Sequence, residues 1–172
     1  MTRLEFANGT AVTMRRYNAD DIDFMLDRIG EFLNHDRFMG FENHFKGVEF
    51  NRDKMKAKLI ANVDNPKFFA NLIFNDDGVL VAGLCGEICE YIFSSDILAV
   101  DYLFYFAPEF TNLQTLFAII RAYVDWAEAH KVREVQLSSS TWFKQGKFEK
   151  LMRYIHFKPF MAGYSRRFLH KS

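Results

Sequence analysis

Apolar residues recur at helical spacing in three stretches of the chain. The first stretch follows Asn18, which can cap a helix whose first turn is acidic. Its apolar positions are three or four residues apart, as expected for one buried face: Ile22, Met25, Ile29 and Leu33. A second helix is expected after Asn51. The third and longest helix is expected from about Asn112 to His130, with an inner stripe of Leu113, Leu116, Ile120, Val124 and Ala127.

Between the second and third helices the pattern becomes that of strands. Apolar runs separated by two turns predict strands at Lys67–Phe74, Val79–Phe93 and Ile97–Phe106. Shorter strands are predicted at Ala11–Arg16, Arg133–Ser138 and Phe160–Leu169, a short helix at Gly146–Tyr154, and a loop at His35–Phe50. The order β-α-α-β-β-β-α-β-α-β predicts an α/β fold. Middle hairpins and later crossover helices favour a mixed sheet in one domain over residues 1–172.

The composition narrows the classes of partner. Lys plus Arg and Asp plus Glu are both 22, so the net charge is zero, which argues against a nucleic-acid coat or a polybasic membrane binder. Aromatic residues reach 17% of the chain, with 20 phenylalanines. Four of them fall in the expected loop: Phe38, Phe41, Phe45 and Phe50. We expect them to form a surface patch through which two copies associate as a homodimer.

The two cysteines and the chain start bear on the compartment. Cys85 and Cys89 lie four positions apart, too far along a strand for easy bridging, and no His or Cys lies nearby to make a metal site. Two small buried thiols in a reducing compartment are expected. No stretch approaches the ~18 apolar residues of a membrane span, and Met1–Thr10 lacks an apolar signal region. We therefore expect a soluble cytoplasmic protein.

Two segments resemble a known family. Phe104–Ile120 reads FYFAPEFTNLQTLFAII and His156–Arg167 reads HFKPFMAGYSRR. They are similar to "LYVHPEYRGKGIGSALL" and "GFKPVG" of the GNAT superfamily, the acetyl-CoA-dependent N-acyltransferases. Tyr105, Pro108 and Glu109 fall in register with the first segment, and Tyr91–Pro108 resembles a subgroup encoded by tailed bacteriophages. The resemblance implies a sheet of about six or seven strands flanked by about four helices. It also implies acyl transfer from acetyl-CoA to an amine, with no amine named.

The chain departs from the family at its cofactor motif. The family's Q/R-x-x-G-x-G/A signature lets backbone N–H groups at a helix start approach the CoA pyrophosphate. Here Thr111 stands at the first position, and Gln114 and Leu116 stand at the glycine positions, where they are expected to crowd that approach. Thr111–Gln114 also fits a capping box, which would satisfy two of the helix's free donors and close the site from within. Met152 stands where the family has a proton-donating Tyr, and Met cannot donate a proton.

Candidate site residues follow from the resemblance and from strand alternation. The resemblance implies cofactor contacts at Tyr105, Phe106, Thr111, Asn112, Gln114, Thr115, Leu116 and Gln145. Alternation places Asp101, Leu103 and Tyr105 on one face of their strand. Asp101, in a hydrophobic context, is the candidate base, and Tyr105 is the candidate acid. The alternatives are a structural Asp101 at a strand end or paired with Arg, and a Tyr105 that only packs in the core.

Two functions of different classes stay open. The first is a weak N-acyltransferase that uses acetyl-CoA. The second is a protein of the same fold that has lost catalysis and serves as a binding or structural module. The element order is compatible with both, and the replaced glycines and the replaced Tyr favour the second.

Overall fold

The computed structural model describes residues 1–6, 9, 11–34, 37–38, 41–42, 49–107, 113–138, 150 and 152–159 of the 172-residue chain. The chain divides into two compact units, Met1–Trp142 and Phe143–Ser172. The sheet and its long helices belong to the first unit, and a short helical segment at residues 152–154 belongs to the second. The expectation of one domain over residues 1–172 stays a prediction. The predicted final strand at Phe160–Leu169 lies outside the described residues.

Six strands form one sheet, in the order β1-β2-β5-β6-β7-β8. Their bounds are β1 (Thr2–Glu5), β2 (Ala11–Arg16), β5 (Phe68–Asn75), β6 (Leu80–Glu90), β7 (Ile97–Phe106) and β8 (Glu134–Val135). Neighbours pair antiparallel except β7 and β8, which pair parallel. This mixed sheet confirms the predicted fold class, and the bounds of β2 and β7 agree with the predicted strands. The sequence analysis missed β1 at the chain start and the hairpin of β3 (Arg37–Phe38) and β4 (Phe41–Glu42), where it predicted a loop.

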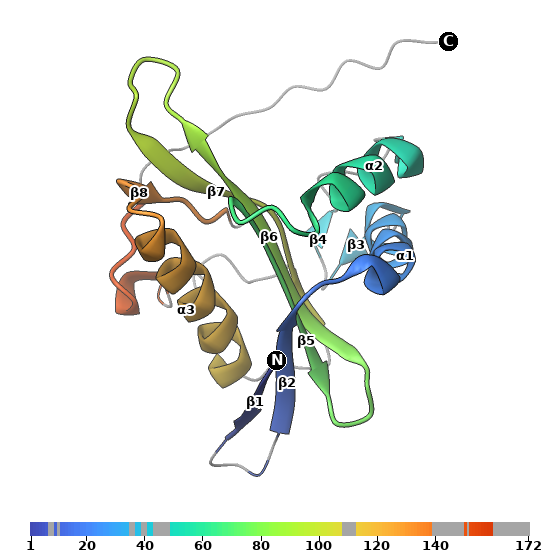
Figure 1. Ribbon diagram of the computed structural model, residues 1–172. Helices are drawn as coiled ribbons and strands as arrows, with labels where there is room; N and C mark the ends of the chain where they lie inside the picture. Colours follow the sequence, from blue (N-terminus) through green and yellow to red (C-terminus); the bar gives the residue numbers. More distant parts are fainter. Residues whose placement is uncertain are drawn as a thin grey trace. The chain divides into compact units, whose positions relative to one another are not determined.

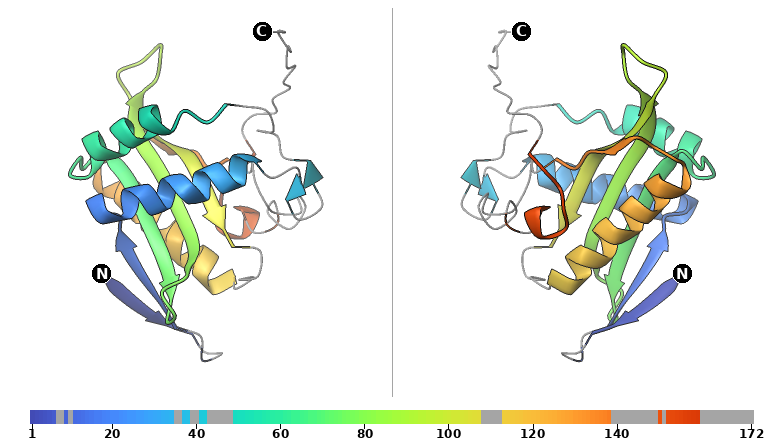
Figure 2. Two further views of the ribbon diagram at one scale, coloured as in Figure 1. Left: turned by 90° about the vertical axis from the view of Figure 1, so that its right-hand side faces the viewer. Right: turned by 90° about the vertical axis from the view of Figure 1, so that its left-hand side faces the viewer.

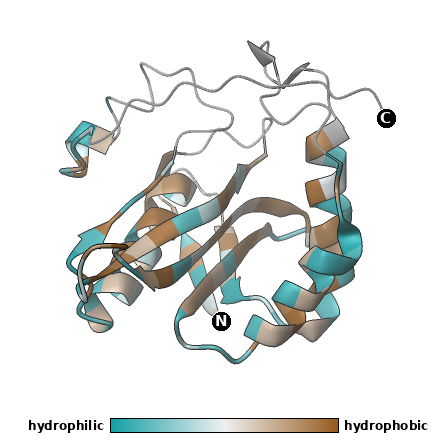
Figure 3. Ribbon diagram, turned by 90° about the horizontal axis from the view of Figure 1, so that it is seen from above, coloured by the Kyte–Doolittle hydropathy of each residue, from teal (hydrophilic) through white to brown (hydrophobic). Residues whose placement is uncertain are grey.

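Helices cover both faces of the sheet. Helices α1 (Ile22–Asn34) and α2 (Arg52–Asn62) lie on one face, and α3 (Leu113–Ala129) lies on the other (Figures 1 and 2). Both predicted caps are confirmed. Asn18 forms a capping box at the 3-10 turn η1 (Ala19–Asp21) that leads into α1, and Asn51 Oδ1 accepts from Lys54 N at 2.9 Å. Hydrophobic residues dominate the central strands, whereas the helices mix both kinds (Figure 3).

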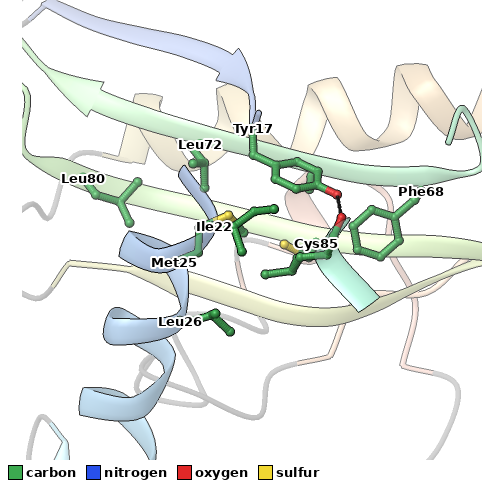
Figure 4. Packing of buried hydrophobic residues seen from close by; sticks show 10 residues of the cluster. Tyr17, Ile22, Met25, Leu26, Phe68, Leu72, Leu80 and Cys85 are labelled. Atoms are coloured by element: carbon green, nitrogen blue, oxygen red, sulfur yellow. Dashed lines mark hydrogen bonds between the residues drawn. The ribbon is translucent and has the colours of Figure 1, made fainter. Parts of the chain in front are cut away.

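The core between the sheet and α1 with α2 is aromatic and aliphatic. Tyr17 and Phe68 meet edge to face with ring centroids 6.2 Å apart, and the Tyr17 hydroxyl donates to Leu59 O at 2.7 Å (Figure 4). The expectation that Phe50 lies at the surface was wrong: Phe50 packs half-buried against this core, with its ring against Gly30 of α1. The side chains of the other three loop phenylalanines lie outside the described part of the chain.

One arginine ties the end of α2 to the sheet. The Arg16 guanidinium donates to four main-chain carbonyls, at Asn62, Val63, Asn65 and Phe68, over 2.8–3.1 Å. Two of these carbonyls belong to the last turn of α2 and its cap, where a helix leaves its acceptors unpaired and carries partial negative charge. A residue of β2 thereby fixes the position of the helix end.

Helix α3 buries a stripe that is shifted from the predicted one. Leu116, Ile120 and Ala127 are buried as expected, together with Thr115, Ile119 and Tyr123. The expectation for Leu113 was wrong: its side chain is 56% exposed at the helix start, and Val124 is only half-buried. The buried stripe includes Tyr123, which packs against aromatic rings of β5 and of α3 itself. That ring lies 5.2 Å from Phe69 and 5.6 Å from Trp126, between ring centroids.

Candidate functional site

Strands β7 and β8 pair over only a short distance. Leu98 and Ala99 are the β7 residues in the parallel ladder, and Gln136 N then donates to Ala99 O at 2.8 Å. Strand β7 continues to Phe106, but the next contact between the two segments is made by a side chain. Ser138 N and Ser138 Oγ donate to the two carboxylate oxygens of Asp101, both at 2.7 Å. The main-chain ladder therefore ends beside Asp101 among the described residues.

A β-bulge lies at the same point of β7. Gly86 of β6 faces Asp101 and Cys85 faces Leu103, so Tyr102 is an extra residue in β7. A Cβ on Gly86 would lie 2.6 Å from the Val100 carbonyl oxygen and 2.9 Å from the Tyr123 ring. Only glycine allows β7 and α3 to approach β6 this closely.

The bulge changes which β7 side chains share a face. Leu103 and Tyr105 pack with the core beneath α1, and the Lys58 ammonium of α2 lies 3.8 Å from the centre of the Tyr102 ring. Asp101 lies on the other face, since its partner Gly86 faces Tyr123 of α3. The prediction that Asp101 shares a face with Leu103 and Tyr105 was wrong, because it assumed unbroken alternation.

The environment of Asp101 is that of a half-buried carboxylate without a cation among its described partners. Burial raises the pKa of Asp101, and the two hydrogen bonds from Ser138 limit the rise. Nearby, burial raises the pKa of Tyr123 and the Asp101 charge adds to the rise. The Tyr123 hydroxyl donates to Gln136 O at 3.5 Å, a long bond. The alternative in which Asp101 pairs with Arg is not what the described residues form; the partner is Ser138, 37 residues away.

The expected cofactor residues fall into three groups. Tyr105 is half-buried beneath α1, and Phe106 is 7% exposed, one position along β7. At the start of α3, Gln114 is exposed, while the side chains of Thr115 and Leu116 have no exposed surface. Leu116 thus belongs to the core, and contact with a ligand at this helix end would have to come from main-chain groups. Thr111, Asn112 and Gln145 lie outside the described residues, as does the expected capping box.

The first turn of α3 has features that suit an anion. It carries no acidic residue, so no carboxylate there would repel a phosphate. The Thr115 hydroxyl is fully buried and has no hydrogen-bond partner among the described residues. Buried polar groups normally have a hydrogen-bond partner, so this hydroxyl is one polar group whose partner is not among the described residues.

The second unit contains the position of the replaced Tyr. Met152 is 8% exposed and Tyr154 is 76% exposed. Phe157 N donates to Met152 O at 2.8 Å and His156 N to Arg153 O at 3.1 Å, which is the pattern of a Schellman helix end. His156 has a φ of 67°, a left-handed conformation that favours glycine. The family places glycine at this position, so the backbone here is compatible with the resemblance.

The cysteines are both free, as expected. Cys85 is buried as expected, and burial raises its pKa to about 12. The expectation that Cys89 is also buried was wrong, because its side chain is only half-buried, although burial raises its pKa as well. Neither thiol is therefore suited to act as a nucleophile near neutral pH. The part of the chain that the structure describes holds no cluster of three or more metal-ligating side chains. Within that same part, none of the helices has the length and apolar character needed to cross a membrane.

No protein-family profile and no curated protein matches the chain. Solved structures do match it. An aminoglycoside N-acetyltransferase in complex with CoA has a TM-score of 0.66 and 14% identity, covering 94% of this chain and 97% of that one. A protein described as a predicted acetyltransferase from Clostridium acetobutylicum, with acetyl-CoA, has a TM-score of 0.65 and 10% identity, covering 91% of this chain and 96% of that one. An aminoglycoside 6′-N-acetyltransferase from Acinetobacter baumannii has a TM-score of 0.62 and 10% identity, covering 92% of this chain and 99% of that one.

Similarity at these identities establishes the fold. The chain has the fold of the GNAT acetyltransferases, as the sequence resemblance implied. The resemblance to phage-encoded members and the loss of the cofactor motif stay predictions.

Two residues that shape this region were absent from the sequence predictions, Gly86 and Ser138. Gly86 had a signal, because glycine inside a strand often marks a bulge or a close approach of another backbone. Ser138 had none beyond its place at the end of a predicted strand, since its partner is 37 residues away.

Proposed function

We propose that the protein transfers an acyl group from acyl-CoA to an amine. The observation that carries the proposal is the end of the β7–β8 ladder beside Asp101, in a chain that shares its fold with acetyltransferases crystallised with CoA and acetyl-CoA. In the family that the sequence resembles, a main-chain N–H of this strand holds the oxyanion, and the position falls near Tyr105 and Phe106. The side chains there are free to differ between members because the backbone does this work.

The residues at the start of α3 fit the phosphates of CoA in part. The absence of acidic residues from the first turn of α3 suits an anion. Because Thr115 and Leu116 bury their side chains, the main-chain N–H groups at this end, with Gln114, would make the contacts. We keep Thr111, Asn112 and Gln145 as proposed contacts on the resemblance alone. Bound there, acyl-CoA would supply an activated thioester.

The reaction needs one proton to leave the amine and one to reach the departing sulfur. The neutral amine nitrogen forms a bond to the thioester carbonyl carbon, the carbon–sulfur bond breaks, and the products are an amide and the CoA thiol. We propose Asp101 as the group that accepts the amine proton. Its partial burial supports this role, and no ammonium or guanidinium group among its described partners neutralises it.

Two variants of Asp101 separate proton transfer from positioning. Asp101→Asn keeps an oxygen for Ser138 N and an amide for Ser138 Oγ but cannot accept a proton. Asp101→Ala removes both functions. If Asp101 is the base, both variants should lose roughly 10²–10⁴-fold in kcat. If Asp101→Asn keeps the full rate while Asp101→Ala loses it, Asp101 is a positioning residue that joins β7 to the segment after β8.

Binding of acetyl-CoA is the decisive test of the function. A ligand that binds the native state stabilises it by RT ln(1 + [L]/Kd), about 2.7 kcal/mol at 100 times Kd. For a chain of this size that corresponds to roughly 5–10 °C in Tm. A shift of this kind, together with release of free CoA thiol in the presence of amines, is expected. No shift at millimolar acetyl-CoA would favour the second candidate, a binding or structural module, which the replaced Tyr at Met152 already suggests.

A further inference from the structure

We propose that the outer edge of strand β1 pairs antiparallel with the same edge of a second copy of this chain. Strand β1 (Thr2–Glu5) is the first in the order of the six-stranded sheet, so among the described strands only β2 pairs with it. Figures 1 and 2 show β1 at the outer border of the sheet. The main-chain N–H and C=O groups that point outward from such an edge are a template for another strand.

Strand β1 lacks several features that usually protect an edge strand from pairing. It contains no proline and no lysine, and its register with β2 runs without a bulge along the whole strand. Natural sheets use these devices against edge-to-edge association. Charged side chains on an edge also oppose pairing, but Arg3 and Glu5 have opposite signs and cancel within the strand. A copy of β1 is therefore not repelled by net charge.

The order of residues in β1 favours one register with a second copy. If Leu4 lies opposite Leu4 of the second copy, Arg3 lies opposite Glu5 of that copy, and Glu5 lies opposite its Arg3. Opposite charges in directly facing positions stabilise a sheet, and like charges destabilise it. A pairing centred on Arg3 or on Glu5 would instead place two like charges opposite each other. Charge complementarity therefore selects the register centred on Leu4, in which the edge is complementary to itself.

The side chains at this edge are available to a partner. Arg3 Nε donates to Glu5 Oε1 at 3.3 Å, and Arg3 Nη1 lies 3.2 Å from Asp76 Oδ1. All three side chains are more than half exposed, so these ion pairs contribute little to stability and can rearrange. Leu4 lies on the opposite face from the two charges of β1, next to Val12 of β2, and is half-buried. Leu4 of a second copy would cover part of its remaining apolar surface.

The proposed dimer leaves the candidate site open. Strands β1 and β8 lie at opposite ends of the strand order, so two copies joined at β1 would form one sheet with a β8 strand at each end. The proposal therefore does not depend on acyl transfer, and its surface differs from the loop phenylalanines predicted to associate. An edge of four residues buries little area, which places the dimer in the weak class of interfaces.

The test measures self-association of the full chain by sedimentation equilibrium at low ionic strength, from about 10 µM to about 1 mM. The wild type should associate over this range and dissociate as salt is added, because salt screens the paired charges. Arg3→Glu and Glu5→Arg each place like charges opposite each other, so each should weaken association by about tenfold or more. Arg121→Glu and Asp125→Arg change the charge equally at an exposed ion pair of α3, and these matched controls should stay within about twofold of the wild type.

Combining the two variants tests the register itself. An equimolar mixture of Arg3→Glu and Glu5→Arg should form heterodimers, because opposite charges again face each other in both positions. The double variant Arg3→Glu/Glu5→Arg should associate with itself but not with the wild type, whose charges would then face like charges. If neither the mixture nor the double variant recovers association, the single variants act by disturbing β1 and the proposal is wrong. A wild type that stays monomeric at about 1 mM and low salt also overturns it. A wild-type dimer that Arg3→Glu and Glu5→Arg leave unchanged uses another surface, which equally refutes pairing through β1.

Discussion

Replacing Gly86 with alanine should test whether this glycine fixes the bulge of β7. The new Cβ would lie 2.6 Å from the Val100 carbonyl oxygen, 2.9 Å from Cε2 of the Tyr123 ring and 3.0 Å from the Tyr123 hydroxyl oxygen. Neither neighbour can move cheaply, because the carbonyl belongs to a paired strand and Tyr123 has no exposed surface. Overpacking of this kind costs about 1–3 kcal/mol or more, against about 0.5–1 kcal/mol gained by replacing a strand glycine. We expect a net loss of about 2 kcal/mol.

Gly83 on the same strand provides the matched control. Its Cβ would meet the end of the flexible Leu72 side chain at 3.3 Å, and the Asn71 carbonyl oxygen at an ordinary contact distance of 3.8 Å. Gly83→Ala should therefore change the free energy of unfolding by less than about 1 kcal/mol. Urea titrations of both variants give their free energies of unfolding, which can be compared if the m-values of the two variants agree. If Gly86→Ala is as stable as Gly83→Ala, then β7 or Tyr123 adapts freely and our account of the bulge is wrong.

Three further predictions concern a helix end, an ion pair and the second unit. Lys131 has a φ of 58° at the end of α3, a conformation that favours glycine, so Lys131→Gly should stabilise the protein by about 0.5–1 kcal/mol in urea titrations. A destabilised variant would mean that the Lys131 side chain makes a stabilising contact that glycine loses. Hydrogen bonds from Arg15 lower the pKa of Asp21 in the folded protein. The ionised Asp21 therefore stabilises the fold at pH values above the unfolded-state pKa, and this stabilisation is lost as the pH falls through the lower folded-state pKa. Asp21→Asn should cost about 1.5–3 kcal/mol near pH 7, and the difference from the wild type should shrink as the pH falls below about 4; a constant difference would contradict the ion-pair account. Met152→Tyr, which restores the proton donor that the family resemblance implies, should raise any residual acyl-transfer rate by up to ~10²-fold, and robust turnover insensitive to residue 152 would indicate another route.

The sequence predicted those features that local chemistry determines. The caps at Asn18 and Asn51 depend on residues within three positions of each helix start, and both are confirmed. The bounds of β7 follow from an apolar run that begins after a turn and stops at a proline, and the structure agrees with them. The mixed α/β class follows from the order of such elements.

The arrangement of the candidate site depends on contacts between distant residues. Alternation along β7 is broken at Tyr102 because Gly86 admits the close approach of Val100 and Tyr123, and no periodicity in β7 itself carries that information. As a result Asp101 and Tyr105, predicted on one face, lie on opposite faces of the strand. The partner of Asp101 was equally hidden, since Ser138 comes from a segment after the next strand.

The extra residue in β7 is a point at which this strand can change its length. Asp101 already faces Gly86 and Leu103 already faces Cys85, so deleting Tyr102 would remove the bulge and leave every remaining pair of the ladder unchanged. A change of one residue elsewhere in the paired strand would turn the side chains beyond it to the opposite layer. Among natural variants of this protein, we therefore expect changes in the length of Ile97–Phe106 to fall at the bulge, even where the identities of its residues drift.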